Sequence, residues 1–319
     1  MNTPKNIKNK LDTIHIHGLN AVIISGLLLL FFMSKNPSFI NNVEAFNIKD
    51  STDQNQFKTL SVNIENDKKE NLRYQLQIED PQLSRHIIGM SAIVYDVTNN
   101  STFWSMGENK TYSLASLTKV MTTYIYKEKC DKEVYYTGLK FTSDDALRYM
   151  LIESSNEMAD ILASKCMGKE QFIIEMNNKA QSLKLNLHYN NPSGMDYPGV
   201  IGGRGDALSM ATFLSIASAR YPEIFDYTTH KNSIIKVYHK NDISYVDAYN
   251  TNPSIDSIGG ARLSKTGLTD YAGGNLGVVY DPYIGRTLVL LVLGSTKEGR
   301  FLDIAKIKEN IIVKYTSNL

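Results

Sequence analysis

Apolar residues in the middle of the chain recur at helical spacing. Two stretches, residues 114–129 and 157–167, place them three and four positions apart, which predicts two helices that each bury one face. The residues that set this spacing are Leu117, Val120, Met121, Tyr124, Ile125, Met158, Ile161 and Leu162. We expect a helical lobe over residues 115–220 that contains both helices.

Shorter apolar runs on either side of this lobe predict strands. The runs are residues 88–97, 101–106, 261–264, 275–280 and 287–293, and the sheet is expected to resume after Ile234. Between the last two runs, Pro282 presets φ and Gly285 supplies a positive φ, which favours a turn and an antiparallel meander. The sequence therefore predicts an α+β fold: an antiparallel five-stranded sheet flanked by helices, plus the helical lobe, with the functional site between them.

The N-terminus predicts export. A basic n-region, residues 1–17, precedes an apolar segment, residues 18–33. Its apolar run, residues 21–33, is short for a spanning helix and normal for a signal peptide. The nearest small-residue cleavage site, at Ala45, lies far beyond this run. We therefore favour an uncleaved signal anchor with its lysines inside, and a cleaved signal peptide is the alternative. Both place the remaining chain outside the cytoplasm.

Two segments separate the apolar run from the main domain, residues 84–319. Residues 34–56 are rich in Asn, Asp and Ser, which is typical of a polar tether. Within residues 57–80, two alternating apolar runs flank the turn-like residues 66–71 and predict a β-hairpin. A lone hairpin is marginally stable, so its apolar face must be covered. We favour an extension that packs on the domain over a docking surface for a partner.

Composition excludes some classes of function. The formal net charge of +1 provides no basic field for nucleic acid. Cys130 and Cys166 lie at the ends of two predicted helices and form either a disulfide or two free thiols. Neither the cysteines nor the six histidines have metal-ligand spacing, so we expect no metal and no cofactor.

Three short motifs carry the candidate chemistry: Ser116-Leu117-Thr118-Lys119, Ser154-Ser155-Asn156 and Lys265-Thr266-Gly267. Ser116 and Lys119 lie three positions apart on a predicted helix, so their side chains share a face. A serine hydroxyl needs an adjacent base, and a lysine can serve only if burial or a second cation keeps its amine neutral. Lys265 is the candidate for that cation. Each motif alone is weak, but the three in this order point to acyl transfer through a serine ester.

The motifs and their surroundings resemble a known family. The segments YSLASLTKVMT, LIESSNEMAD, NPSGMDYPG and LSKTGLTDYAGGNLG are similar to those of low-molecular-mass penicillin-binding proteins that act as D-alanyl-D-alanine carboxypeptidases, in the serine β-lactamase-like superfamily. The resemblance implies a hydrolase that trims peptidoglycan stem peptides and is inhibited by β-lactam antibiotics. It also implies a bacterial cell membrane protein with an extracytoplasmic catalytic domain, or a secreted protein if the N-terminal segment is cleaved.

The resemblance assigns catalytic roles to four residues. Ser116 is implied to be the nucleophile and Lys119 its base. Ser154 is implied to relay a proton, and Asn156 to hydrogen-bond the substrate.

Five further residues are implied to bind the substrate. Lys265 and Thr266 are expected to bind its carboxylate, and Gly267 to let it approach the strand closely. The backbone N–H groups of Ser116 and Leu268 are expected to form the oxyanion hole. Arg300, near the start of the last helix, is expected to help hold the carboxylate.

The chain also departs from the family pattern. Only 38 residues separate Ser116 from Ser154, so residues 130–141 must replace a longer excursion. Residues 185–193 contain no acid to activate a deacylating water, which argues against an efficient β-lactamase. The alternatives are a DD-endopeptidase or β-lactamase of the same superfamily, and a non-catalytic peptidoglycan-binding or sensor protein. Stem-peptide preference and oligomeric state stay open.

Overall fold

The computed structural model describes residues 73–107, 109–240, 242–283 and 285–316. The predicted n-region, apolar segment and tether lie outside these ranges, as does the first strand of the predicted hairpin. Within them, no helix combines the length and the apolar character needed to cross a bilayer.

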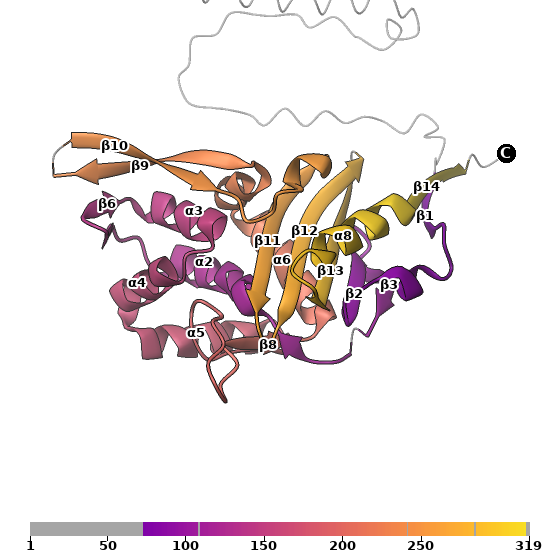
Figure 1. Cartoon of the computed structure of the whole chain (residues 1–319), viewed down its shortest axis with the longest axis horizontal. Coiled ribbons are helices and arrows are strands. Elements are labelled where there is room, and N and C mark those ends of the chain that lie inside the picture. The colour runs from indigo at the N-terminus through magenta and orange to yellow at the C-terminus, as the bar shows by residue number, and fades with distance from the viewer. Residues whose placement is uncertain (1–72, 108, 241, 284, 317–319) are drawn as a thin grey trace, which may run out of the picture. The chain divides into compact units, whose positions relative to one another are not determined.

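A five-stranded antiparallel sheet forms the centre of the domain (Figure 1). In spatial order its strands are β11 (Ala261–Thr269), β12 (Gly273–Tyr283), β13 (Arg286–Ser295), β2 (Ser91–Asp96) and β3 (Ser101–Met106). The register of β12 shifts after Tyr280, so Pro282 lies at an irregularity that tolerates its missing N–H. The predicted α+β fold, with its antiparallel five-stranded sheet and helical lobe, is confirmed.

Helices cover both faces of this sheet, α6 (Ala207–Arg220) on one and α8 (Gly299–Asn310) on the other. Successive residues of a strand point to opposite faces, so β13 contributes to two apolar cores. Val289, Leu291 and Leu293 join the core of α6, and Leu288, Leu290 and Val292 join the core of α8. Burial on both sides explains why β13 is a continuous apolar run in the sequence.

The helical lobe contains four helices: α2 (Thr118–Lys129), α3 (Ser143–Glu153), α4 (Asn156–Met167) and α5 (Lys169–Ser182). Side-chain caps fix two of their starts, because Thr142 accepts from the N–H of Asp145 and Ser155 accepts from the N–H of Met158. A disulfide between Cys130 and Cys166 joins the C-terminal ends of α2 and α4, which decides between the two states that the sequence left open.

After Ile234 the central sheet resumes only at β11, because the first two strands of this region form another sheet. β9 (Asn232–His239) and β10 (Asp242–Tyr249) form a long ribbon that pairs with β6 (Leu139–Phe141) and β5 (Val134–Tyr136) (Figure 1). The short connection between the first two motifs therefore folds into half of a separate four-stranded sheet.

Smaller elements complete the domain. They are β4 (Tyr112–Ser113), β7 (Leu187–Tyr189), β8 (Gly203–Gly205), α7 (Pro222–Phe225), and the 3-10 turns η2 (Leu83–His86), η3 (Ala115–Leu117), η4 (Asp226–Thr229) and η5 (Ile255–Ser257).

A separate two-stranded sheet joins the two ends of the described chain. β1 (Arg73–Ile78) pairs antiparallel with β14 (Ile311–Thr316), which follows α8. β1 is the second strand of the predicted hairpin. The hairpin itself stays a prediction, because its first strand lies outside the described residues.

Candidate active site

Ser116 lies on a constrained turn that leads into α2. The preceding residue, Ala115, has φ of 46°, in the left-handed region that residues with a side chain rarely adopt. Ala115 and Leu117 are fully buried, whereas Ser116 is partly exposed. The turn therefore presents the Ser116 hydroxyl from an otherwise buried segment.

Two glycines let other segments approach this turn. A Cβ on Gly194 would lie 1.9 Å from the carbonyl oxygen of Ala115, and a Cβ on Gly267 would lie 2.8 Å from that of Leu114. Gly194 also has φ of 76°. Any larger residue would push the loop around Gly194, or strand β11, away from Ser116.

The amine of Lys119 is fully buried one helical turn after Ser116. Its Nζ lies 2.8 Å from Ser116 Oγ, 2.6 Å from Asn156 Oδ1 and 2.7 Å from the carbonyl oxygen of Ser193. Three segments thus meet at one nitrogen: the turn before α2, the start of α4 and the loop around Ser193.

These three partners orient the lone pair of a neutral amine. The oxygens of Asn156 and Ser193 can only accept hydrogen bonds, so they take the two N–H groups of the neutral form. The hydroxyl of Ser116 can also donate. The lone pair of Lys119 therefore points to Ser116, which is the geometry of a base that receives the serine proton.

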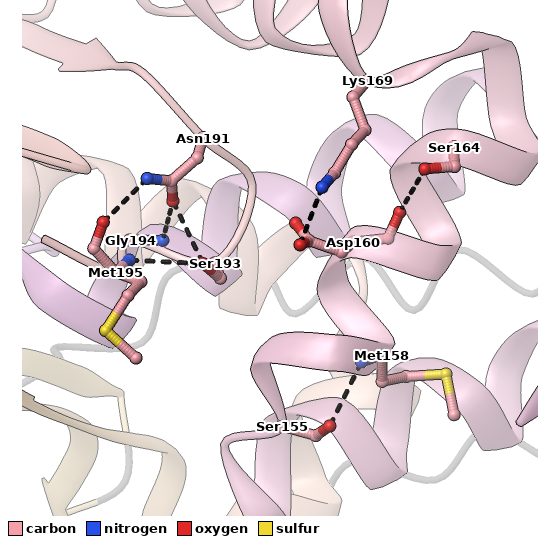
Figure 2. A network of polar contacts seen from close by, with 9 residues as sticks. All are labelled: Ser155, Met158, Asp160, Ser164, Lys169, Asn191, Ser193, Gly194 and Met195. Atoms are coloured by element: carbon pink, nitrogen blue, oxygen red, sulfur yellow. Dashed lines mark hydrogen bonds and ion pairs between the residues drawn. The ribbon is translucent and has the colours of Figure 1, made fainter. Parts of the chain in front are cut away.

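Burial favours this neutral form. It lowers the pKa of Lys119 to about 7, although the carboxylates of Asp160 and Glu157 oppose the shift. Asp160 itself forms an ion pair with Lys169 at 2.8 Å (Figure 2).

Asn191 holds the loop that supplies the Ser193 carbonyl, as Figure 2 shows. Its side chain accepts from the N–H of Gly194 at 2.7 Å and from the hydroxyl of Ser193 at 3.1 Å, and it donates to the carbonyl of Met195 at 2.8 Å. These three hydrogen bonds fix the tight turn of residues 191–195, so Asn191 is a positioning residue for Lys119.

Ser154 and Lys265 form a second pair beside the first. Ser154 ends α3 in the left-handed conformation, and Lys265 Nζ donates to its hydroxyl at 2.9 Å and to the carbonyl of Thr266 at 3.1 Å. Burial lowers the pKa of Lys265 well below its ordinary value, and the positive charges of Lys119 and Arg300 lower it further. Burial therefore lowers the pKa of both lysines, and Lys265 is not among the groups that shift the pKa of Lys119, contrary to the role predicted for it.

The remaining predicted residues lie on β11 and at the start of α8. Thr266 Oγ1 lies 2.6 Å from Thr251 Oγ1, and Arg300, which is buried, donates from Nη1 to the carbonyl of Gly267 at 2.6 Å. Arg300 forms no ion pair with Asp303, whose carboxylate instead accepts from Ile88, Gly89 and Ser295. The side chain of Leu268 is exposed. The oxyanion and carboxylate roles of these residues stay predictions.

Several positioning residues had no sequence signal. Asp196 accepts from Ser113 and Thr269, and buried Asn275 donates to the carbonyl of Ser113 at 2.9 Å. Both lie in segments that resemble the family, but single Asp and Asn residues have no motif of their own. In the part of the chain that the structure describes, no cluster of His, Cys, Asp or Glu is placed to hold a metal ion.

The family model described as D-alanyl-D-alanine carboxypeptidase matches residues 127–296, just over half of the chain. The matched part contains the second and third motifs. It begins after Ser116 and Lys119 and ends before Arg300, so the geometry above is the evidence for those three residues.

Curated relatives carry two names. A D-alanyl-D-alanine endopeptidase of Pseudomonas aeruginosa is 29% identical over 252 residues, which cover 71% of this chain and 78% of that protein. The D-alanyl-D-alanine carboxypeptidase DacF of Bacillus subtilis is 23% identical over 252 residues, which cover 72% of this chain and 63% of that protein.

Solved structures share the fold. Penicillin-binding protein D2 of Listeria monocytogenes, in its ampicillin-bound form, superposes with a TM-score of 0.62 at 24% identity, over 70% of this chain and 97% of that one.

Acylation of Ser116 is predicted to follow the titration of Lys119. Because the base form must be present, the second-order rate of acylation by benzylpenicillin should rise with pH through about 7 and level off above it. Lys119→Arg should abolish the reaction, since guanidinium stays protonated. Stopped-flow measurements between pH 5 and 9 check this, and retained acylation in the arginine variant would exclude Lys119 as the base.

Asn191→Ala is predicted to slow acylation roughly 10- to 100-fold. Without Asn191 the loop shifts and displaces the Ser193 carbonyl, so a buried N–H of Lys119 loses its acceptor. An unpaired buried group of this kind costs ~1–3 kcal/mol. The pH midpoint should also move down, since a lost acceptor disfavours the ammonium form. Asn177 is a matched control, because its side chain also makes three hydrogen bonds, to Ile173 and Tyr189, and none to Lys119 or its three partners. Asn177→Ala should lower the melting temperature but leave the pH midpoint in place; equal midpoint shifts in both variants would contradict a local role for Asn191.

Proposed function

We propose that this chain, which belongs to the D-alanyl-D-alanine carboxypeptidase family of serine peptidases, removes the terminal D-Ala from peptidoglycan stem peptides through an acyl-enzyme at Ser116. The observation that carries the proposal is the placement of Lys119. Its buried amine donates to two carbonyl oxygens and has the hydroxyl of Ser116 as its third partner, so its lone pair faces the serine proton.

Acylation begins with transfer of the Ser116 proton to Lys119. As the proton leaves, Ser116 Oγ attacks the carbonyl carbon of the penultimate D-Ala and forms a tetrahedral oxyanion. We assign the backbone N–H groups of Ser116 and Leu268 to that oxyanion, where loss of one such donor typically costs ~3 kcal/mol. Asn156, held by Lys119 at 2.6 Å, is placed to bind the peptide next to the scissile bond.

Collapse of the intermediate breaks the amide bond and releases D-Ala. The leaving nitrogen takes up one proton, for which the pair of Ser154 and Lys265 is the donor route in this proposal. Water then hydrolyses the Ser116 ester: the proton of the water passes to the pair of Ser154 and Lys265, and Lys119 returns its proton to the serine oxygen. Each turnover regenerates the neutral Lys119.

Recognition of a free carboxylate is the step that defines a carboxypeptidase. Lys265 and Arg300 are buried basic groups on and behind β11, and Thr266 adds a hydroxyl. Burial, and after it the charges of Lys119 and Arg300, lower the pKa of Lys265, so an arriving carboxylate would raise that pKa and favour the charged ammonium. The site is thus complementary to an anion.

A DD-endopeptidase is the second candidate. It is favoured by the name and the 29% identity of the Pseudomonas aeruginosa relative. The two activities share all the acylation steps above and differ in the group that leaves.

We also propose that the N-terminal apolar segment anchors the enzyme in the bacterial cell membrane, with the catalytic domain on the extracytoplasmic side. The disulfide between Cys130 and Cys166 supports this, since such bonds persist in oxidising compartments.

Penicillin is predicted to form one stable adduct on Ser116. Incubated with benzylpenicillin, the wild-type chain should gain the mass of one penicilloyl group, and Ser116→Ala should gain none. No acid is present in residues 185–193 to activate a deacylating water, so the adduct should persist. Intact-mass spectrometry over time checks both points. An unlabelled wild type would favour the sensor alternative, and rapid turnover would favour a β-lactamase.

Arg300→Ala is predicted to lower kcat/KM for a peptide that ends in D-Ala-D-Ala by roughly 10- to 100-fold, because a charged hydrogen bond contributes ~1.5–3 kcal/mol. A thioester substrate whose leaving group has no carboxylate should lose much less. Arg300→Lys, which retains the charge, should recover part of the loss. Equal losses on both substrates would assign Arg300 to supporting the Gly267 backbone alone. Faster cleavage of a cross-linked dimer than of the peptide by the wild type would favour the endopeptidase.

A further inference from the structure

Exposed apolar side chains concentrate on one face of the four-stranded sheet. Of the fourteen large apolar side chains that are exposed in the described part of the chain, five lie on the sheet β10-β9-β6-β5. These five are Tyr135, Ile234, Ile243, Tyr245 and Tyr249, each 53–66% exposed. Concentrations of this kind mark binding surfaces in soluble domains.

The strand register places these side chains on the same side of the sheet. Residues paired across antiparallel strands project to one face. The pairs are Tyr249 with Asn232, Asp247 with Ile234, Tyr245 with Lys236, Ile243 with Tyr238, Tyr238 with Lys140, and Lys140 with Tyr135. We call these residues the outer face.

The opposite side of the same sheet belongs to the core. The alternate residues Ile235, Val237, Ala248, Val134 and Phe141 are buried in the apolar cluster of the helical lobe. α3 packs against β6, β9 and β10 on this side, and the ribbon β9–β10 runs over it (Figure 1). The outer face therefore has no packing role inside the described domain.

The outer face mixes aromatic rings with hydrogen-bonding groups. The ammonium groups of Lys140 and Lys236 each lie 5.1 Å from the centre of the Tyr238 ring. Tyr245 and Tyr249 lie four residues apart on β10, about 13 Å along the strand. Protein interfaces deplete Lys and Asp at their centre, whereas this face carries both between its rings. A sugar ring presents a face of C–H groups and a rim of polar groups. Aromatic rings that stack on the C–H face, with hydrogen-bonding side chains beside them, therefore suit a carbohydrate.

The outer face is continuous with the active site. The N–H of Tyr249 donates to the carboxylate of Glu153, the residue before Ser154. Two residues after Tyr249, Thr251 meets Thr266 on β11. From there β10 extends for eight residues, about 27 Å, away from Ser116. A long narrow platform that starts at the site fits a linear polymer better than a compact ligand.

We propose that the outer face binds the glycan strand of peptidoglycan while an attached stem peptide reaches Ser116. The inference rests on the proposed function for its choice of polymer. Tyr135, Tyr245 and Tyr249 stack on sugar rings, and Lys140, Lys236 and Asn232 hydrogen-bond their polar substituents.

The test uses the full-length chain in mild detergent and two probes: peptide-free glycan strands released from peptidoglycan by an amidase, and a soluble peptide that ends in D-Ala-D-Ala. Tyr245→Ser should weaken glycan binding roughly 10-fold in calorimetry, as expected for loss of one stacked ring. Tyr245→Phe, which retains the ring, should stay within about twofold of wild type. Ile174→Ser, at another half-exposed position on α5, should change nothing.

Activity provides the second readout. Tyr245→Ser should lower D-Ala release from polymeric peptidoglycan while leaving soluble-peptide turnover and penicillin acylation unchanged. Absence of glycan binding by the wild type overturns the inference, and so does equal loss on polymer and soluble peptide. A dimer that Tyr245→Ser dissociates in sedimentation velocity would assign the face to a second copy. A wild type that binds glycan but fails on every peptide would refute the proposed function alone.

Discussion

The active site depends on one buried amine. Transfer of a charged ammonium from water into a protein interior is unfavourable, so full burial of Lys119 favours its neutral form. Burial alone would leave polar hydrogens without partners. The carbonyl of Asn156 and that of Ser193 remove this penalty and at the same time orient the remaining lone pair. The two hydrogen bonds that satisfy the buried amine are therefore also the contacts that orient it as a base.

The surrounding backbone is shaped to bring these contacts together. The turn at Ala115, the loop held by Asn191 and strand β11 approach closely, and glycine is the residue that fits at Gly194 and Gly267. Lys265 adds a second buried base, whose pKa is lowered by burial first and then by the charges of Lys119 and Arg300. The protonation of Lys265 is thus sensitive to an anion that enters the site.

The sequence predicted those parts of the molecule that local patterns encode. The three motifs, the helical lobe and the C-terminal meander follow from spacing and periodicity, and the spacing of Ser116 and Lys119 placed their side chains on one face. The contact of Asn156 with Lys119 was not predicted. The contribution of Ser193 was missed because a backbone carbonyl has no side-chain signature. The pairing of β9 with β6 was also missed, since residues 140 and 238 are linked only by tertiary packing. For the same reason, nothing in the local pattern of residues 73–78 identified β14 as their partner.

Strand pairings between the two ends of the domain determine when the enzyme becomes competent as it folds. β2 pairs with β13, so that Asp96 lies opposite Leu288, and β1 pairs with β14, so that Arg73 lies opposite Thr316. Contacts between residues so distant in sequence form slowly and late. The segment with Ser116 and Lys119 leaves the ribosome long before β11 is synthesised. A growing or truncated chain therefore has the nucleophile and its base but lacks the strand that completes the site. Activity is a property that only the finished chain acquires.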